Sequence, residues 1–473
     1  MEASACCSPT EQLLKRTTSR CPVCHVSSPA EVWRTEGPNA KVFLRRTCPV
    51  HGESETCISS DARFYWLAQG DPRNAGNGSG GGGNACRASD GAVRGTLGRN
   101  AEGKGDAPFE KLSTCLALIE IVNSCNLACP TCYANSPVGA GQNVDAIPLA
   151  DLQRRIQGVI DRKGRIEILQ LSGGEPTLHP QFFELLAWAR ENPGIDYLLL
   201  NTNGVRIAND RAFSEQLSRS FDYGGLQLYL QFDGVQREGQ HFLRSADLRE
   251  TRRRAIERCA EMNLPITLAM TVTPENLPHL WEAIEFGLKY PHVRGVAFQP
   301  MFGSGRVPLN ASARLNTADI ILAAVAQSAG QLRFEDFTPL PCGDPNCATI
   351  GYLLKANGRT YSVSDFIDFA QVQGFLRDKV RYKLEDLMKC GCDSEPLGEL
   401  LREFELNETN TFRLFIKPFM DAGTWDEDRI DRCCTHVIRP DGKLDSFCRY
   451  YSGFADVRVA PDEERTAAST CAC

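Results

Sequence analysis

Histidine, tryptophan and long apolar runs are scarce in this sequence. Its 473 residues include only 7 His, 5 Trp and 6 Met. No run of roughly 18 apolar residues occurs, so no membrane-spanning helix is expected. The first residues, MEASACCSPTEQ, also lack the basic start and apolar core of a secretory signal, and we therefore expect a cytoplasmic protein.

An excess of positive charge is also lacking. The 52 Lys and Arg residues are outnumbered by 59 Asp and Glu residues, which gives a formal net charge of -7. Because binding to a phosphate backbone requires a concentrated basic face, we expect no nucleic-acid partner. The hydrophobic content of 42% is typical of a globular protein with a buried core.

Cysteine, by contrast, is abundant. The chain has 21 cysteines, an odd number. In a reducing compartment, clustered thiols are more often metal ligands than disulfide partners. The spacing of these cysteines is therefore the main guide to function.

Composition divides the chain into six segments. A glycine-rich stretch separates a small cysteine-bearing module from a long region in which apolar runs alternate with amphipathic stretches. The predicted segments are a mobile tail (1–19), a metal module (20–70), the linker (71–108), an α/β core (109–330), a second cysteine-bearing domain (331–455) and another mobile tail (456–473).

Six strands are predicted in the core, with helical segments between them. The strands are residues 116–122, 166–171, 197–202, 226–232, 266–272 and 294–300. This alternation predicts an α/β fold with a parallel sheet and right-handed crossovers. Ligands gather where such strands end, and polar or glycine-containing motifs follow most of these strands.

The first of these motifs holds three cysteines. Cys125, Cys129 and Cys132 have C-x3-C-x2-C spacing directly after the first strand. Three such thiolates can ligate three irons of a four-iron, four-sulfur cluster and leave the fourth iron open. A zinc site with a remote fourth ligand is the alternative that the spacing leaves open.

The second motif, Gly173-Gly174-Glu175-Pro176, ends the next strand. Paired glycines let a backbone approach a ligand closely, and the Glu175 carboxylate can receive an ammonium group. Together, SCNLACPTCYANS and LSGGEPTLHP strongly resemble the radical S-adenosylmethionine (SAM) superfamily, over roughly residues 113–305.

The resemblance implies a partial (β/α)6 TIM-like barrel and a type of radical reaction. In this family, SAM chelates the open iron, and an electron from the reduced cluster cleaves SAM to methionine and a 5′-deoxyadenosyl radical. The radical removes hydrogen from an unactivated carbon. A donor such as flavodoxin or ferredoxin is then an expected partner.

The same resemblance implies roles for individual residues. The three cysteines and Glu175 form the catalytic set, with Glu175 on the SAM ammonium and Tyr133 near the adenine. Asn201 and Asn203, in the NTNG motif, are expected to reach the ribose or carboxylate, unless that motif is a plain turn. Asp233 is expected to contact SAM or substrate, unless it caps a helix.

The N-terminal module carries two knuckles, CPVC and CPVHG. Cys21, Cys24 and Cys48 supply three metal ligands, and either His51 or Cys57 supplies the fourth. A module this short needs a metal for stability. The metal is a structural zinc or a single redox-active iron.

The C-terminal region adds further candidate ligands for one or two auxiliary iron–sulfur clusters. Some of its cysteines, notably Cys390, Cys392 and Cys434, are alternatively ordinary small residues. The candidate ligands are Cys342, Cys347, Cys390, Cys392, Cys433, His436 and Cys448.

The whole order of motifs resembles the tetraether lipid synthase-like radical SAM proteins, including pterin methyltransferase-like members. The motifs CPVC…CPVHG, PCGDPNC and CCTHVIRPDGKLDSFCRYY carry this resemblance. It implies a rubredoxin-like N-terminal domain and carbon–carbon coupling of long-chain lipids, with peripheral contact at a membrane surface. The alternatives are radical methylation or C–H modification of a soluble substrate such as a pterin, and an inactive electron-transfer or scaffold protein.

Overall fold

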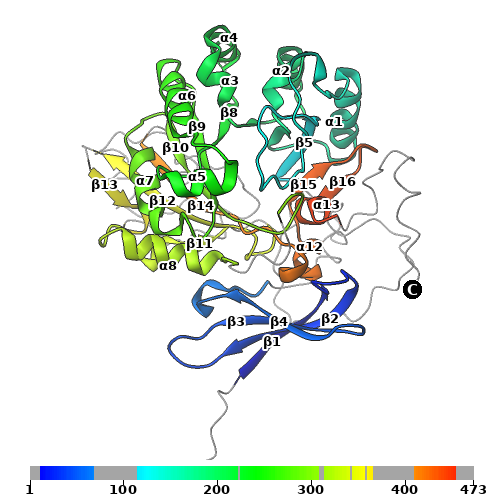
Figure 1. The fold of residues 1–473 in the computed structure, drawn as a ribbon, viewed down its shortest axis with the longest axis vertical. Helices are drawn as coiled ribbons and strands as arrows, with labels where there is room; N and C mark the ends of the chain where they lie inside the picture. Colours follow the sequence, from blue (N-terminus) through cyan, green and yellow to red (C-terminus); the bar gives the residue numbers. More distant parts are fainter. Residues whose placement is uncertain are drawn as a thin grey trace, which may run out of the picture.

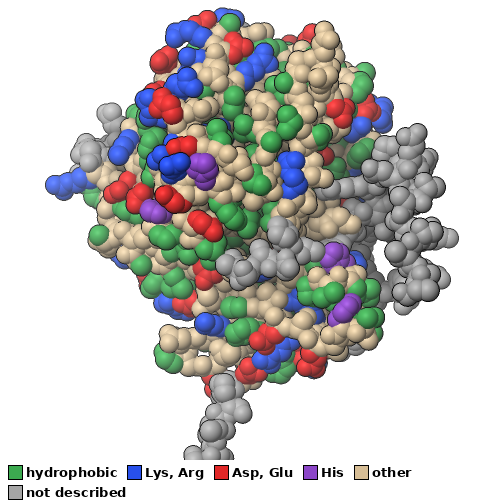
Figure 2. Space-filling model, in the orientation of Figure 1, with side chains coloured by type: hydrophobic (Ala, Val, Ile, Leu, Met, Phe, Trp, Pro, Cys, Tyr) green, Lys and Arg blue, Asp and Glu red, His purple; other side chains and the backbone are tan. Residues whose placement is uncertain are grey.

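The computed structural model describes residues 11–68, 114–221, 224–307, 314–340, 343–356, 359–365 and 410–453. The proposed linker (71–108), Cys342, Cys390 and Cys392 lie outside these residues. No helix of the described ranges is long and apolar enough to cross a membrane. Acidic and basic side chains are interspersed over the face shown in Figure 2.

Six parallel strands form the centre of the molecule, in the order β5-β6-β7-β8-β9-β10 (Figure 1). Each predicted strand is present, within three residues of its expected start. The strands are β5 (Leu116–Val122), β6 (Leu169–Gly173), β7 (Leu198–Thr202), β8 (Leu226–Gln231), β9 (Ile266–Val272) and β10 (Val293–Pro300).

Helices cover the outer face of this sheet and bury its apolar side chains. In β9, Ile266, Leu268, Met270 and Val272 are fully buried in the hydrophobic core. The alternate residues of a strand point to the opposite face. The helices are α1 (Leu149–Lys163), α2 (Phe182–Glu191), α3 (Val205–Asn209), α4 (Arg211–Phe221), α5 (Arg237–Arg244), α6 (Arg249–Glu261), α7 (Leu280–Leu288) and α8 (Thr317–Gln327).

The C-terminal region joins the same sheet at both edges. β14 (Thr411–Ile416) pairs in parallel with β10, and β15 (Thr435–Ile438) pairs in parallel with β5. The boundary predicted at residue 330 is therefore wrong as a division into independent domains, because both flanking strands extend the barrel. The remaining elements here are β11 (Thr338–Pro339), β12 (Thr349–Ala356), β13 (Arg359–Ser362), α12 (Glu427–Asp431), β16 (Leu444–Ser446) and α13 (Phe447–Tyr451).

The N-terminal module is a four-stranded antiparallel sheet. Its strands are β1 (Glu11–Arg20), β2 (Ser27–Thr35), β3 (Val42–Cys48) and β4 (Gly52–Ser59). Much of the predicted tail, residues 1–19, therefore belongs to the module, because β1 already pairs with β2 from Glu11 onward. The alternating polar residues of β1 conceal this strand in the sequence.

Buried polar contacts dock this module on the C-terminal region. Lys15 Nζ lies 2.6 Å from Asp426 Oδ2, and Thr17 donates to the same carboxylate at 2.7 Å. Arg46 donates to the carbonyl oxygens of Ala422 and Gly423 at 2.9 and 2.8 Å. The module lies below the barrel in Figure 1, against α12.

Candidate active site and metal centres

The three-cysteine motif forms a loop between β5 and α1. The Cys125 N–H donates to Pro137 O at 2.8 Å, and Gly139 N–H donates to Cys125 O at 2.9 Å, which closes the loop. Cys125, Cys129 and Cys132 all line one cavity of about 290 Å³ inside the barrel. The structure thus brings the three predicted ligands to one site.

The donor set fits a three-thiolate cluster better than zinc. Four zinc ligands surround one ion tightly, whereas the ligand atoms of these cysteines are not gathered within 4.8 Å of one another. No histidine lines the cavity, and its one lining carboxylate, Asp233, is paired with Arg244. Within the described residues, nothing offers zinc a fourth ligand here, and three thiolates with an open iron suit the site.

A second loop, after β10, holds the cysteine loop from the other side. Arg306 N–H donates to Cys132 O at 3.0 Å, and Ser304 Oγ donates to Tyr133 O at 3.0 Å. Gly305 has φ +58, and a Cβ there would lie 2.4 Å from both of these carbonyl oxygens. The glycine is therefore required for the two loops to meet.

Gly173 and Gly174 permit a close backbone approach, as predicted, but the neighbour is the cysteine loop. A Cβ on Gly173 would lie 2.1 Å from Val122 O, and one on Gly174 would lie 2.0 Å from Ser124 O. Gly174 N–H donates to Val122 O at 2.8 Å, and both glycines line the cavity. These glycines fix the start of the cysteine loop at the cavity wall.

Glu175 does not have the geometry expected of it. Its carboxylate is fully buried and does not line the cavity. It accepts hydrogen bonds from Thr177 N and Oγ1 (3.2 and 2.7 Å), Thr202 Oγ1 (2.7 Å) and Asn203 N (2.7 Å). In this structure the carboxylate caps the short 3-10 helix Pro176–Leu178 and ties β6 to the end of β7, and the contact of Glu175 with the SAM ammonium stays a prediction.

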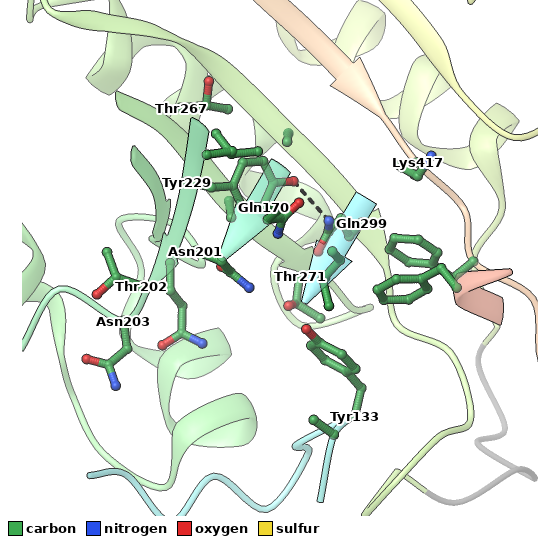
Figure 3. Close-up of a pocket in the computed structure, with 18 of the residues that line it drawn as sticks. Tyr133, Gln170, Asn201, Thr202, Asn203, Tyr229, Thr267, Thr271, Gln299 and Lys417 are labelled. Atoms are coloured by element: carbon green, nitrogen blue, oxygen red, sulfur yellow. Dashed lines mark hydrogen bonds between the residues drawn. The ribbon is translucent and has the colours of Figure 1, made fainter. Parts of the chain in front are cut away.

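Asn201 and Asn203 line the cavity at the end of β7 (Figure 3), and their contact with SAM stays a prediction. Asn203 Nδ2 lies 2.6 Å from Asn126 Oδ1 and 3.8 Å from Cys125 Sγ. Asn201 Nδ2 donates to Ser172 Oγ at 3.1 Å. A plain turn does not account for these side chains, because both face the cavity.

Asp233 also lines the cavity, but its carboxylate is occupied. Arg244 Nε and Nη2 donate to it at 2.7 and 2.9 Å, and Thr271 N–H donates at 3.2 Å. The alternative of a helix cap is wrong, because α5 begins at Arg237 after Gln236. Burial lowers the pKa of Arg244, but the Asp233 and Cys129 groups raise it well above its usual value.

Arg244 is a site residue that the sequence did not reveal. It is the last residue of α5, where basic residues are common for their interaction with the helix dipole. Only the folded chain places it between Asp233 and Cys129.

The inward side chains of β6, β8, β9 and β10 form a polar wall, of which the sequence indicated only Gln299, as a weak candidate. Gln299 Nε2 donates to the Tyr229 hydroxyl at 2.9 Å (Figure 3), and the Tyr197 hydroxyl donates to Gln227 Oε1 at 3.3 Å. In the sequence, this wall is indicated only by polar residues at alternate positions of the strands. The residues of this polar wall are Gln170, Gln227, Tyr229, Gln231, Thr267, Thr271 and Gln299.

Aromatic rings close the cavity beside the cysteine loop. The Tyr133 ring lies 4.9 Å from that of Tyr451 and 5.8 Å from that of Phe447. Phe419 stacks on Phe447 at 4.0 Å, and Phe302 lies 5.3 Å from Phe419. Tyr133 therefore lies at the cavity as predicted, within an aromatic wall built from three parts of the chain.

The N-terminal module gathers Cys21, Cys24, Cys48 and His51, whose ligand atoms lie within 4.8 Å of one another. Cys57 is not in this group. Its thiol, on β4, instead donates to Ser59 O at 3.4 Å. His51 is therefore the fourth member of the set, and Cys57 is not. Three thiolates and one imidazole form a zinc ligand set, whereas a rubredoxin-type iron needs four sulfurs.

Three of the candidate cysteine ligands of an auxiliary cluster lie in the described residues, Cys347, Cys433 and Cys448. Cys433 and Cys448 belong to one buried cluster, and burial, with a smaller effect of the Cys347 thiol, raises the pKa of both. Arg429 Nη2 lies 3.7 Å from Cys347 Sγ. These thiols lie close together, and their role as cluster ligands remains a prediction.

His436 is not a metal ligand in this structure. Its ring is fully buried, with Nε2 2.9 Å from Cys433 O and Nδ1 3.3 Å from Thr114 Oγ1. Since a carbonyl oxygen only accepts, Nε2 carries the proton and Nδ1 accepts from the hydroxyl. Both nitrogens are therefore used within the protein.

Comparison with known proteins agrees with this geometry. Residues 119–287 match the radical SAM superfamily, and residues 13–60 match the HMPTM N-terminal zinc ribbon domain. The 7,8-dihydro-6-hydroxymethylpterin dimethyltransferase of Methanocaldococcus jannaschii is 26% identical over 92% of this chain and 93% of its own. The GTP 3′,8-cyclase of Klebsiella pneumoniae subsp. pneumoniae is 35% identical over 20% of this chain and 28% of its own.

Among solved structures, Streptococcus suis SuiB aligns with 45% of this chain and 45% of its own, with TM-score 0.35 and 16% identity. The radical SAM domain implies SAM and a four-iron, four-sulfur cluster as cofactors. The chain thus contains a radical SAM domain with a zinc ribbon ahead of it, and over most of its length it is similar to a pterin dimethyltransferase.

Proposed function

We propose that this enzyme modifies a carbon of a small polar heterocycle, by radical methylation or a related C–H modification of a dihydropterin-like substrate. The observation that carries the proposal is the polar wall of the cavity. Side-chain amides both donate and accept hydrogen bonds, which suits the ring nitrogens and carbonyl of a pterin. The similarity to the pterin dimethyltransferase over most of both chains supports the same substrate class.

The proposed roles follow from the positions of the side chains. Cys125, Cys129 and Cys132 would hold the cluster, and Asn201 and Asn203 would orient SAM from the end of β7. When bound, the cluster and SAM supply the 5′-deoxyadenosyl radical.

The walls of the cavity complete the proposed site. The Tyr229–Gln299 pair, fixed at 2.9 Å, would present a hydroxyl and an amide to one edge of the substrate. The aromatic wall of Tyr133, Phe302, Phe419 and Phe447 would exclude water from the radical. Planar rings in this wall could also stack on a flat substrate.

Carbon–carbon coupling of lipid chains is a second candidate, favoured by a separate observation. The opposite arc of the cavity, on β5, β12 and β14, carries the apolar residues Leu116, Leu118, Ile350 and Phe415 beside two cations, Arg413 and Lys417. Alkyl chains could lie along this arc, between β14 and β15. The two arcs thus favour different substrates, and an experiment must separate them.

The test is anaerobic turnover of the reconstituted enzyme with SAM and a reductant. Parallel reactions contain 7,8-dihydro-6-hydroxymethylpterin, a dispersed phospholipid, or no substrate, with Cys125→Ala as the control. We expect 5′-deoxyadenosine in all wild-type reactions and a methylated pterin in the first. A chain-linked lipid without a modified pterin would establish the second candidate instead, and no 5′-deoxyadenosine above the control would refute both.

A further inference from the structure

Two cations lie on the cavity face of β14. Phe412, Leu414 and Ile416 are at most 1% exposed and face the core. Because side chains alternate along a strand, the other face carries Arg413, Phe415 and then Lys417, all of which line the cavity. About 13 Å of extended strand separates the two cations, so they occupy different levels of the barrel.

Lys417 lies where the barrel strands are not joined by backbone pairing. Its Nζ donates to Thr435 Oγ1 at 2.9 Å, and its own N–H donates to Phe298 O at 2.9 Å. β14 pairs with β10 on one side and with β12 on the other, whereas β15 pairs with β5, and among the described strands no ladder links β15 to β14 or β12. The ammonium therefore bridges the seam of the barrel.

The charges lining the cavity do not balance. Its charged lining residues, besides the cysteines, are Asp233, Arg244, Arg413 and Lys417. Asp233 is paired with Arg244 at 2.7 Å, and in the described ranges no carboxylate lies within ion-pair distance of Arg413 or Lys417. Two uncompensated positive charges thus lie inside a chain whose net charge is -7.

The Lys417 ammonium donates a hydrogen bond to Thr435 and has further N–H donors that a ligand could use. It lies 5.8 Å from the centre of the Phe419 ring, on the aromatic wall. An ammonium has three N–H donors, and Thr435 takes one of them. Its side chain is partly buried, and because desolvating an ammonium is costly unless acceptors or an anion compensate it, an acidic ligand group would suit the remaining donors.

We propose that Lys417 binds an anionic group of the substrate, a phosphate or a carboxylate, at the seam between β14 and β15. The inference rests on the proposed function only in taking this cavity as the substrate site. A phosphorylated heterocycle and a phospholipid headgroup offer the same chemistry, and the neutral pterin would then bind more weakly than its phosphate ester. Arg413, deeper in the barrel, contributes positive potential without touching the same group.

A competing role for Lys417 is to offset the nearby Cys433 thiol, on which its charge acts. The two roles differ in what a charge-removing substitution changes. Loss of substrate affinity follows from the first role, and an altered auxiliary metal centre follows from the second.

The experiment compares Lys417→Gln and Lys417→Arg with Lys355→Gln. Lys355 is a matched control: it also lies 5.8 Å from a phenylalanine ring and donates to a backbone oxygen, but it is outside the cavity. Equilibrium dialysis measures binding of 7,8-dihydro-6-hydroxymethylpterin, its phosphate ester, and phosphatidylglycerol vesicles. The iron content and electron paramagnetic resonance spectrum of each variant are recorded beside it.

We expect Lys417→Gln to raise the Kd of one phosphate-bearing probe about 10- to 100-fold, as for a lost charge-assisted hydrogen bond. Lys417→Arg restores most of this affinity, and Lys355→Gln changes nothing. If Lys417→Gln weakens binding of the phosphate ester, the phosphate belongs to a heterocycle. If it weakens binding of the vesicles, the phosphate belongs to a lipid headgroup. Equal loss for the neutral pterin, no binding of either phosphate probe, or a changed metal signal with unchanged affinity would overturn the inference, while turnover of the neutral pterin would still support the proposed function.

Discussion

Replacing Gly174 by alanine should detach the cysteine loop from the barrel. The new Cβ would lie 2.0 Å from Ser124 O, whereas ordinary contact begins at 3.4 Å, so the two backbones must separate by 3.4 − 2.0 = 1.4 Å. That shift breaks the hydrogen bonds from Gly174 N to Val122 O (2.8 Å) and from Glu175 N to Ser124 O (3.0 Å). Two lost bonds of about 1 kcal/mol each, plus packing strain of about 1–3 kcal/mol, give a destabilisation of about 3–5 kcal/mol.

The assay is the iron and sulfide content after anaerobic reconstitution, together with the rate of 5′-deoxyadenosine formation. Gly158→Ala is the matched control, because on α1 its Cβ would meet only the Arg162 side chain, at 3.4 Å. We expect Gly158→Ala to retain the cluster and to gain about 0.5–1 kcal/mol from helix propensity. Retention of zinc in the N-terminal module and a cooperative thermal unfolding transition would show that Gly174→Ala still folds. If Gly174→Ala carries full iron and produces 5′-deoxyadenosine at the wild-type rate, the argument from close approach is refuted.

Three further predictions concern other parts of the molecule. Glu175→Gln should lower the free energy of unfolding in urea by about 2–4 kcal/mol, since the new amide nitrogen must face one of the groups that donate to Glu175. The control Glu184→Gln, on the exposed face of α2, should change the free energy of unfolding little. His51→Ala should reduce bound zinc, measured by mass spectrometry of the metal, and Cys57→Ala should not; equal losses would contradict the Cys3His assignment. Burial lowers the pKa of His292 to about 4 in the folded protein. Its contribution to stability is therefore complete above the pKa of the unfolded chain, near 6.5, and is lost as the pH decreases below that value. About 2 kcal/mol should be lost between pH 8 and pH 5, and His292→Gln should flatten that dependence in urea midpoints.

The sequence determined the central barrel because its signals are local. Alternation of apolar runs and amphipathic segments placed the six parallel strands, and the spacing of Cys125, Cys129 and Cys132 after β5 identified the cysteine loop. In each case neighbouring residues carry the signal, through strand or helix periodicity or through ligand spacing.

Tertiary structure decided what depends on distant partners. The Glu175 carboxylate could be assigned only once Thr202 and Asn203, from the next strand, were seen to use its lone pairs. The choice of His51 over Cys57 depended on the closing of the two knuckles, and β1 became a strand only by pairing with β2. Arg244 and Lys417 became site residues because separate strands and helices converge on one cavity. Sequence motifs and their resemblance to a known family thus indicated the cofactor chemistry, whereas the charge and polarity around the substrate arise only when the barrel encloses a volume.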